Sequence, residues 1–498
     1  MNETNKRQRP LPLYRAEQVR AMDSYAIDRL GIQSMELMRR AGAAAFAALR
    51  RRWPGTRTLS VVCGSGNNAG DGYVLARLGV DAGMDVRVYP LAAPEKLHGD
   101  TLVACEEYKA VGGSLLDFVP ADFEGAQVLV DGLLGTGLDR KVAGLYAEVI
   151  RGMNRFSGEV LALDIPSGLH ADTGRAMDEA VNANCTVTFI GLKQGLFTGD
   201  GPEHCGELVF AGLDMPPSVQ ASQPASAWLL PPWQSRLPRR ARGAHKGNFG
   251  HVLVVGGAPG FSGAARMAAE SAARVGAGLV SLATHPDHAA LMNIIRPELM
   301  CHAVANADQL APLMAQASVI AVGPGLGLGQ AGWGRVLFEA VQDSGLPLVV
   351  DADALNLLAL APLKRDDWVL TPHPGEAARL LQITTGAVQA DRFAAIAALR
   401  ERFGGTVVLK GAGTLILGRS STEPSVCTQG NPGMATGGMG DVLTGAIAGL
   451  LAQGLDYDEA AEIGVCLHSA AGDKAAEDGE RGLLAGDLMP WLRKLVNL

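Results

Sequence analysis

Cysteine is scarce in this sequence and never paired. The seven cysteines stand alone, at positions 63, 105, 185, 205, 301, 427 and 466, and no Cys-x-x-Cys motif occurs. An odd, unpatterned set excludes a disulfide framework and a cysteine-ligated zinc site as the basis of the fold. We therefore expect free or buried thiols in a reducing compartment.

Long apolar runs and an excess of basic residues are also missing. No apolar stretch approaches the ~18 residues of a membrane-spanning helix, and the first ten residues, MNETNKRQRP, lack the apolar core of a secretory signal. Both observations predict a cytoplasmic protein without a membrane partner. The formal net charge of −8 disfavours nucleic acids and anionic membranes as partners, because both bind basic surfaces.

The sequence is rich in short apolar runs that alternate with helical stretches. At 498 residues, 48% of them hydrophobic, the chain is too long for one core. β-Branched runs such as TLSVVC and HVLVV are typical of parallel sheets covered on both faces. A stretch rich in Pro and Ser, residues 214–245, separates two such halves. We predict an α/β protein with two αβα domains, 1–225 and 226–498.

Two helical segments precede the first predicted strand. In AEQVRAMDSYAIDRL, the apolar residues Val19, Met22, Ala26 and Leu30 share one face. The next segment, SMELMRRAGAAAFAALRRR, begins with Ser34, a residue type that often caps helices. We expect this pair to pack against the first sheet or to form a dimer contact.

A glycine-rich turn follows the first strand. CGSGNNAGDG, residues 63–72, contains Asn67, Asn68 and Asp71 and leads into a helix. The glycines permit close backbone approach, and the helix N-terminus offers N–H donors to an anion. The amide and carboxylate oxygens can also ligate a cation, which a plain dinucleotide-binding turn does not need.

Two further strand ends of this half carry acids. Asp131 precedes the glycine loop 135–141, and Asp164 precedes Ser167 by three residues. Because ligands of open α/β sheets collect at the carboxyl ends of the strands, Asn68, Asp131 and Ser167 could meet around a hard cation. Asp164 would then be free to act as an acid or base. The alternative is that these acids only cap helices.

These motifs resemble a known family. GxGNNxGDG, DGLLGTG and DIPSG, in this order, resemble the N-terminal domain of the bifunctional NAD(P)H-hydrate repair enzymes, over residues from about 15 to 215. In that family this Rossmann-like domain interconverts the R and S hydrates of NADH and NADPH (together NAD(P)HX). The resemblance implies potassium ligands at Asn68, Asp131 and Ser167, and a catalytic and substrate-binding Asp164. Further implied substrate contacts are Asn67, Asn68, Ala69, Gly70, Asp71, Gly135, Thr136, Gly137, Leu138, Asp139, Arg140 and Lys141. Ala69 departs from the family's usual glycine, and its methyl group tightens the turn slightly.

The longest glycine-rich motif, NPGMATGGMGDVLTG, lies in the C-terminal half and holds one carboxylate, Asp441. Its glycines lead into a helix whose N-terminal dipole attracts negative charge. A carboxylate there can take a proton from a hydroxyl group while the helix end stabilises a phosphoryl group in transfer. The alternative is a simple helix cap. No Walker A motif occurs, so a P-loop enzyme is excluded.

Other strand ends of this half are also polar. VVLKGAGTLI places Lys410 before a compact glycine loop that suits nucleotide phosphates, and VGPGLG is a second glycine turn. VVDADALN and LTPHPGE bring further polar groups to strand ends: Asp351, Asp353, Asn356, His373 and Glu376. His373 lies between two prolines, so its backbone is extended, and we favour a substrate contact for it over an incidental loop position.

This half resembles a second group of enzymes. HKGxxG, GPGLG, TPHPGE, KGAGT and NPGMATGGMGDVLTG together resemble the ribokinase-like fold and, more closely, the ADP- or ATP-dependent NAD(P)H-hydrate dehydratases, over residues from about 226 to 498. The resemblance implies nucleotide binding by Lys410, Gly411, Ala412, Gly413, Thr414 and Gly440. It implies contact with the hydrated nicotinamide by Ala264, Gly325, His373 and Asp441. The fusion of both domains is similar to the bacterial arrangement, whose second domain uses ADP and leaves AMP.

The two resemblances imply one pathway of repair. Asp441 would deprotonate the C6 hydroxyl of the S hydrate, ADP with Mg²⁺ would donate a phosphoryl group, and the ring nitrogen would expel phosphate. The K⁺-dependent first domain would recycle the R hydrate, with Asp164 moving the proton through either a ring-opened form or an iminium. The resemblance also implies a homo-oligomer, and leaves ATP as the alternative nucleotide.

Two other functions are compatible with parts of the sequence. A ribokinase-like kinase of a small vitamin-precursor alcohol would share the glycine-rich Asp loop, but would have no use for an epimerase domain. A non-catalytic nucleotide-binding scaffold would resemble the first half, but would not need Asp131, Asp164 and Asp441 together with both nucleotide loops.

Overall fold

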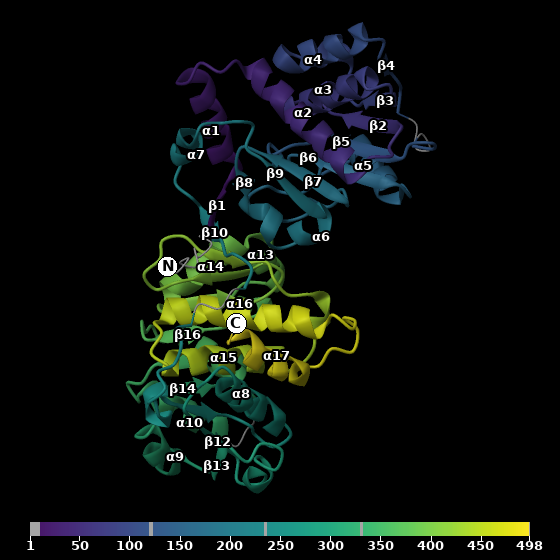
Figure 1. The fold of residues 1–498 in the computed structure, drawn as a ribbon. Coiled ribbons are helices and arrows are strands. Elements are labelled where there is room, and N and C mark those ends of the chain that lie inside the picture. The colour runs from purple at the N-terminus through teal and green to yellow at the C-terminus, as the bar shows by residue number, and fades with distance from the viewer. Residues whose placement is uncertain (1–9, 119–122, 234–236, 329–331, 498) are drawn as a thin grey trace. The chain divides into compact units, whose positions relative to one another are not determined.

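The chain folds into two units of alternating strands and helices (Figure 1). The computed structural model describes residues 10–118, 123–233, 237–328 and 332–497. Within these ranges, one compact unit covers Pro12–Ala227, and the other covers residues 10–11 and 228–497. In the part of the chain so described, every helix is too short or too polar to cross a membrane. The predicted α/β class is confirmed.

The first unit is built around a parallel sheet. Its strand order is β4-β3-β2-β5-β6-β7-β9, and all neighbouring pairs are parallel. The strands are β2 (Thr58–Cys63), β3 (Asp85–Pro90), β4 (Ser114–Leu115), β5 (Val128–Gly132), β6 (Glu159–Leu163), β7 (Cys185–Phe189) and β9 (Glu207–Ala211). The helices are α1 (Ala16–Asp28), α2 (Ser34–Arg52), α3 (Asn67–Asp81), α4 (Gly99–Ala110), α5 (Leu145–Arg155), α6 (Gly201–Cys205) and α7 (Pro217–Ala221). Outside this seven-stranded sheet, β1 (Leu11–Tyr14) pairs in parallel with β8 (Leu192–Lys193).

Successive residues of a strand point to opposite faces of the sheet, and each face packs against its own layer of helices. Val61 packs in a core with α2, α3 and α4, whereas Val62 packs in the core of α5. The chain leaves β2 toward β3 on one side and returns to β5 on the other. The carboxyl ends of β2 and β5 therefore flank a topological switch point, where ligands of such sheets bind.

The predicted helical pair is present, with two differences. Val19, Met22 and Ala26 are buried in α1, but α1 ends at Asp28, so Leu30 lies beyond it and is 38% exposed. Ser34 is the first residue of α2, because the preceding Gln33 has the extended backbone of the N-cap. The predictions for Leu30 and for Ser34 as the cap were therefore wrong.

The second unit has a longer, mixed sheet. Its order is β13-β12-β11-β14-β15-β16-β17-β18-β19-β10, parallel from β13 to β17 and antiparallel from β17 to β19. The strands are β10 (Ala227–Leu229), β11 (His251–Val255), β12 (Leu279–Thr284), β13 (Met300–Ala303), β14 (Val319–Val322), β15 (Leu348–Val350), β16 (Trp368–Leu370), β17 (Thr406–Leu409), β18 (Thr414–Leu417) and β19 (Ser425–Cys427). The helices are α8 (Ser262–Arg274), α9 (Ala307–Met314), α10 (Trp333–Gln342), α11 (Ala352–Leu360), α12 (Pro374–Leu381), α13 (Thr385–Ala390), α14 (Arg392–Phe403), α15 (Met439–Ala452), α16 (Tyr457–Ala475) and α17 (Leu488–Leu495).

Helices α8 and α15 approach each other at backbone distance. A methyl group at Gly445 of α15 would lie 2.0 Å from the carbonyl oxygen of Ala268 in α8. Both helices belong to one core with α16 and α17, against strand residues such as Val252 and Val254. This close packing fixes the N-terminal ends of α8 and α15, which carry the predicted site residues Ala264 and Asp441.

The substitution Gly445→Ala tests this constraint. We expect it to lower the free energy of unfolding of the second unit by about 1–3 kcal/mol, because the new methyl group must push the two helices apart. Urea unfolding followed by circular dichroism measures the change. Gly263→Ala in α8 is the matched control, since a methyl group there meets nothing within 4 Å. It should be neutral or stabilising by up to about 1 kcal/mol. Equal effects of the two substitutions would contradict the packing argument.

Candidate active sites

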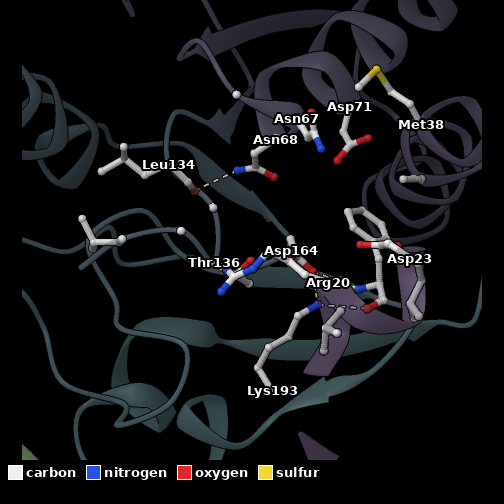
Figure 2. Close-up of a pocket in the computed structure, with 18 of the residues that line it drawn as sticks. Arg20, Asp23, Met38, Asn67, Asn68, Asp71, Leu134, Thr136, Asp164 and Lys193 are labelled. Carbon is white, nitrogen blue, oxygen red and sulfur yellow. Dashed lines mark hydrogen bonds and ion pairs between the residues drawn. The ribbon is translucent and has the colours of Figure 1, made fainter. Parts of the chain in front are cut away.

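The first unit contains a cavity of about 600 Å³ at the carboxyl ends of β2, β5 and β6 (Figure 2). This volume suits a small-molecule ligand. Among the residues predicted for the epimerase, those that line it are Asn67, Asn68, Asp71, Gly135, Thr136, Gly137, Leu138, Asp139, Arg140 and Asp164. The structure thus brings three separate turns of the sequence to one cavity, as the strand-end argument predicted.

The remaining predicted epimerase residues do not line the cavity. Ala69 is buried within α3, and a side chain at Gly70 would point at Met38 of α2. Lys141 is exposed and its Nζ pairs with Asp178 at 3.0 Å. Asp131 and Ser167 are fully buried.

Asp131 and Ser167 form a network of oxygen atoms with the loop after β5. The Ser167 hydroxyl donates to Asp131 Oδ1 at 2.5 Å, and the Ser167 N–H donates to Oδ2 at 2.7 Å. The Leu134 carbonyl lies 3.2 Å from the Ser167 hydroxyl and accepts from Asn68 Nδ2 at 2.9 Å. Burial raises the pKa of Asp131 to about 6, against the hydrogen bonds from Ser167.

The side-chain oxygen of Asn68 has no hydrogen-bond partner among the described residues. Its Oδ1 is buried and accepts no hydrogen bond from any described residue. A buried orphan oxygen calls for an explanation, and an oxygen-ligated cation beside a buried carboxylate is one. No cluster of three or more His, Cys, Asp or Glu side chains capable of holding a metal occurs among the described residues. The mixed set of amide, carboxylate, hydroxyl and carbonyl oxygens instead fits the predicted potassium ion.

Asp164 is held in a strained and heavily bonded position. Its φ of 63° lies in the left-handed region, which costs a non-glycine residue about 1–3 kcal/mol. Its carboxylate accepts from the N–H of Phe189 at 3.1 Å and pairs with Lys193 Nζ. Lys193 is completely buried and also donates to the Thr188 hydroxyl at 3.1 Å and the Phe189 carbonyl at 2.9 Å. The sequence did not predict this ion pair, and the role of Asp164 as an acid or base stays a prediction.

Sequence reasoning missed Lys193, Arg20 and Asp23, which all line the cavity. Lys193 belongs to β8, and Arg20 and Asp23 belong to α1. The spacing of Arg20, Asp23 and Ile27 on one helical face was an available signal. Burial raises the pKa of Asp23 to about 6 and the pKa of Asp71 well above its ordinary value.

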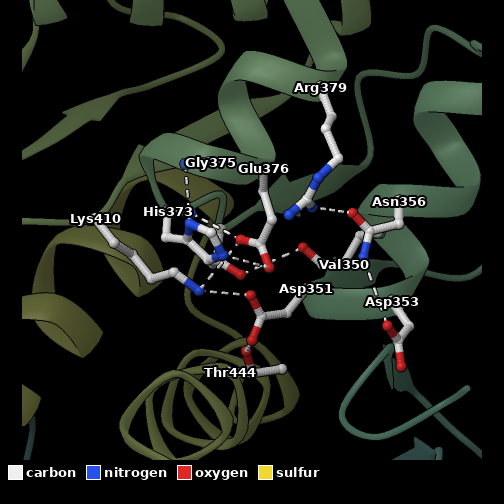
Figure 3. Close-up of polar contacts among 11 residues, drawn as sticks. Val350, Asp351, Asp353, Asn356, His373, Gly375, Glu376, Arg379, Lys410 and Thr444 are labelled. Carbon is white, nitrogen blue, oxygen red and sulfur yellow. Dashed lines mark hydrogen bonds and ion pairs between the residues drawn. The ribbon is translucent and has the colours of Figure 1, made fainter. Parts of the chain in front are cut away.

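A second charged group lies at the carboxyl ends of β15, β16 and β17 in the second unit (Figure 3). Lys410 Nζ pairs with Asp351 Oδ1 at 2.7 Å and lies 3.8 Å from Glu376 Oε2. The Thr444 hydroxyl of α15 donates to Asp351 Oδ2 at 2.8 Å. A Cβ atom at Gly440 would lie 3.1 Å from Lys410 Nζ, so the start of α15 adjoins this group.

This group contains more carboxyl groups than ammonium groups. Burial opposes ionisation of both Asp351 and Lys410, but their mutual attraction outweighs it, so the pKa of Asp351 is lowered and that of Lys410 raised. Burial raises the pKa of Glu376 to about 7. Burial, followed by the charge of Asp351, raises the pKa of Asp441 to about 7. Two carboxyl groups that titrate near neutrality therefore surround one ammonium.

His373 is placed by the helix that follows it. As the N-cap of α12, its Nδ1 accepts from the N–H of Gly375 at 3.0 Å, and its own N–H donates to Glu376 Oε2 at 2.8 Å. Burial and the nearby Lys410 lower the pKa of His373. Its side chain is half-exposed, so the ring edge remains accessible while Nδ1 serves the cap.

The predicted nucleotide loop, Lys410 to Thr414, joins β17 to β18. The guanidinium of Arg392, almost fully buried, donates to the carbonyls of Leu409 at 3.2 Å and Lys410 at 3.3 Å. Gly411 has a φ of 136°, and any side chain there would strike this guanidinium. Thr414 donates to the carbonyl of Gly411 at 2.9 Å. Sequence reasoning missed Arg392 and Thr444.

Ala264 and Gly325 form a separate pair. A Cβ at Gly325 would lie 3.2 Å from Cβ of Ala264. The turn that contains Gly325 continues to Gly327, whose N–H donates to Asp353 at 2.8 Å. Among the described residues, no hydrogen bond or ion pair joins Ala264 or Gly325 to His373 or Asp441. Their convergence on one substrate stays a prediction.

Comparison with known proteins identifies both halves of the chain. The sequence profile described as "YjeF-related protein N-terminus" matches residues 34–195, and that described as "NAD(P)H-hydrate dehydratase" matches residues 252–494. A Coxiella burnetii protein named bifunctional NAD(P)H-hydrate repair enzyme is 51% identical over 97% of this chain and 99% of its own. An Escherichia coli protein of the same name is 41% identical over 98% of this chain and 94% of its own.

A solved structure is similar to the second half. A Bacillus subtilis ADP/ATP-dependent NAD(P)H-hydrate dehydratase, co-crystallised with ATP and Mg²⁺, is 28% identical, with a TM-score of 0.46, and covers 52% of this chain and 94% of its own. The full-length identities decide the assignment, and they confirm the resemblance that the motifs indicated. The chain belongs to the family of bifunctional NAD(P)H-hydrate repair enzymes.

Proposed function

We propose that the protein repairs hydrated NADH and NADPH in two steps. The first domain, 1–225, interconverts the R and S hydrates, and the second, 226–498, dehydrates the S hydrate with ADP to give NAD(P)H, AMP and phosphate. Family membership supports both activities. The observation that carries the proposal is that each unit has its own buried lysine–carboxylate pair beside carboxyl groups of raised pKa.

In the second unit, Asp441 is the general base. It lies in the first turn of α15 and makes no hydrogen bond or ion pair with any described side chain, so its carboxylate can accept the proton of the C6 hydroxyl. The N–H groups at the start of α15 then stabilise the phosphoryl group in transfer. Departure of phosphate, expelled by the lone pair of the ring nitrogen, leaves an iminium, and loss of a proton from C5 to water then restores the C5=C6 bond of the dihydropyridine.

Carboxylates outnumber cations around Lys410, which supports magnesium use. Burial, together with the charge of Asp351, raises the pKa of both Glu376 and Asp441 to about 7, against the opposing charge of Lys410. Glu376 is the best-placed residue to hold Mg²⁺, directly or through water, with Lys410 beside it. Magnesium bound there would neutralise the charge on the phosphates of the nucleotide.

In the first unit, Asp164 moves the proton during epimerisation, and Lys193 holds its carboxylate in place. Asn67 and the loop from Gly135 to Arg140 bind the substrate. Asn68, Asp131, Ser167 and the Leu134 carbonyl hold K⁺, which would satisfy the orphan Asn68 oxygen and the charge of Asp131. Assembly into a homo-oligomer and a cytoplasmic location remain predictions of the sequence.

The proposal is tested by the absorbance of NADH at 340 nm. The protein is mixed with an R/S mixture of hydrated NADH, K⁺, Mg²⁺ and ADP, and the assay is repeated with ATP. Full recovery of the band with ADP is expected. Recovery of only the S fraction would remove the epimerase from the proposal, and no recovery with either nucleotide would overturn it.

Two substitutions should separate the activities in this assay. Asp441→Asn should lower the dehydration kcat at least ~100-fold, because the base is lost, and leave epimerisation intact. Asp164→Asn should do the reverse. Asp478→Asn, which removes an exposed carboxylate of the second unit, should leave both rates unchanged. Loss of both activities from either site substitution would contradict the division into two sites.

Dehydration should depend on pH through Asp441. The raised pKa means that Asp441 is protonated, and inactive as a base, below about pH 7 and becomes active as the pH rises through that value. The kcat for dehydration of the S hydrate should therefore reach half its plateau near pH 7. A kcat that is constant between pH 5.5 and 8.5 would show that Asp441 is not the base.

Potassium should stabilise the first unit. Replacing choline chloride with KCl at equal ionic strength should raise its unfolding temperature, since a ligand at a hundredfold excess over its Kd contributes about 2.7 kcal/mol. Asn68→Ala should abolish the increase. Asn67→Ala, which removes the exposed neighbouring amide, should preserve it. An equal response of both variants would exclude Asn68 as a ligand.

A further inference from the structure

Helix α1 presents charged residues to the cavity of the first unit. Arg20, Asp23 and Ile27, spaced by one helical turn each, are part of the cavity wall (Figure 2). The matched family profile begins at residue 34, so α1 lies outside it. Neither the profile nor the motifs in the sequence assign a function to this helix.

Backbone pairing fixes α1 relative to Lys193. Strand β1, which directly precedes α1, pairs with β8 in the register Tyr14↔Lys193. The N–H of Ala16, the first residue of α1, donates to Asp172 Oδ1 at 2.7 Å, and Gln18 donates to the Pro224 carbonyl at 2.9 Å. The helix is therefore a built-in wall of the cavity and not a loosely attached segment.

The cavity holds more acid than base. Four carboxyl groups line it, those of Asp23, Asp71, Asp139 and Asp164, together with the three cations Lys193, Arg20 and Arg140. Lys193 is committed to Asp164 through their ion pair. The groups that face Asp23 are Lys193 from β8, Asp164 from the end of β6 and Asp71 from α3, with Arg20 one turn away on α1 itself. Asp23 thus remains without a dedicated cation.

Asp164 alone cannot account for inversion at a carbon atom. Lys193 Nζ and the N–H of Phe189 pin its carboxylate. By the iminium route, epimerisation at C6 requires the hydroxyl group to leave from one face of the ring and water to add to the other. A carboxylate that is fixed on one wall of the cavity can exchange protons at only one face of the substrate ring. The other face of the ring therefore needs a second proton-transferring group.

We propose that Asp23 is a second catalytic residue of the first unit, which exchanges protons with the substrate from a different wall of the cavity than Asp164. The proposal rests on the proposed epimerase function. It makes the site a two-carboxyl epimerase, in which the carboxylate of Asp164 pairs with Lys193 and that of Asp23 has no ion pair with any described residue. Two carboxyl groups in unlike environments are a recurrent solution to acid–base catalysis.

The step balances as follows for the iminium route. The C6–O bond breaks with its electron pair on oxygen, which takes the proton of Asp23 to form water, while the ring-nitrogen lone pair forms C6=N⁺. A water molecule then attacks C6 from the other face and gives its proton to Asp164. Transfer of this proton back to Asp23 restores the starting state, and the reverse reaction uses the same two groups in exchanged roles. No oxidant or co-reactant is consumed.

The environment of Asp23 suits this role. Burial raises its pKa to about 6, with the charge of Lys193 acting in the opposite direction. A group that titrates near the working pH is an efficient donor and acceptor. An ordinary surface aspartate, ionised throughout the neutral range, would be a poor proton donor.

The test is Asp23→Asn in the full-length protein. The kcat for conversion of pure R hydrate to S hydrate should fall at least ~100-fold, with KM changed less than threefold, because the amide cannot transfer the proton. Dehydration of pure S hydrate should be unchanged. Asp28→Asn at the exposed end of the same helix is the matched control and should behave as the wild type. Asp23→Glu should recover part of the lost kcat.

Two further measurements exclude a structural explanation. The wild-type pH profile of epimerisation should show a limb near pH 6 that Asp23→Asn lacks. The substitution should not lower the unfolding temperature at pH 8, because it removes a carboxylate whose ionisation is opposed by burial. If Asp23→Asn does unfold early, a folded Asp23→Glu variant decides, with recovered epimerisation supporting the role and its absence opposing it.

The outcomes separate this proposal from the function on which it rests. A wild-type protein that does not epimerise the R hydrate would overturn the epimerase function. An active wild type with an Asp23→Asn variant within twofold of its kcat, or with the limb near pH 6 intact, would overturn the role of Asp23 alone. Loss of dehydration in the same variant would indicate general damage and also count against that role.

Discussion

Each unit of the protein buries one lysine ammonium against one aspartate at the carboxyl end of a parallel strand. Lys193 pairs with Asp164, and Lys410 pairs with Asp351. A charge removed from water is costly unless a partner is held close to it, so each pair dictates the position of the segments that carry it. The strained backbone of Asp164, the Thr444 contact of α15 and the β1–β8 pairing are arranged around these two ammonium groups.

The pairs also shape the chemistry of their neighbours. Each ammonium forms an ion pair with its own aspartate. Other carboxyl groups of the same sites therefore have no cation that fully balances their negative charge: Asp23 and Asp71 in the first unit, and Glu376 and Asp441 in the second. Buried, uncompensated carboxyl groups titrate nearer to neutrality. In the proposed mechanism, the same arrangement supplies proton-transfer groups to two different reactions on two different sheets. A non-catalytic scaffold or a kinase of a small alcohol would not need proton-transferring carboxyl groups in both units.

Local patterns in the sequence predicted what local structure determines. Apolar runs identified the parallel strands, and the polar residues that follow them, such as Asn67, Asp164 and Lys410, indeed lie at the strand ends. Lys193 and Asp23 could not be found in this way, because their position depends on the pairing of β1 with β8, two short strands far apart in the chain.

The errors have a related cause. Leu30 continues the apolar stripe of α1, but the helix ends before it, because the chain turns at Gly31, whose φ of 69° lies in the left-handed region. Ser34 is a suitable cap, yet the backbone of Gln33 takes that position. Helix ends are set by the turn that the chain must make next, which tertiary packing decides.

The first unit begins and ends at one place. Ser226, next to its last residue, donates through its N–H to the carbonyl of Leu13 at 2.9 Å, and Leu13 is next to its first. A compact body whose two ends touch can be inserted into another chain, or joined at new termini, without stretching its fold. This geometry makes the unit transferable as a whole, provided that the cut is made before β1. A cut at residue 34, where the family profile starts, would leave the sheet but discard one wall of its cavity.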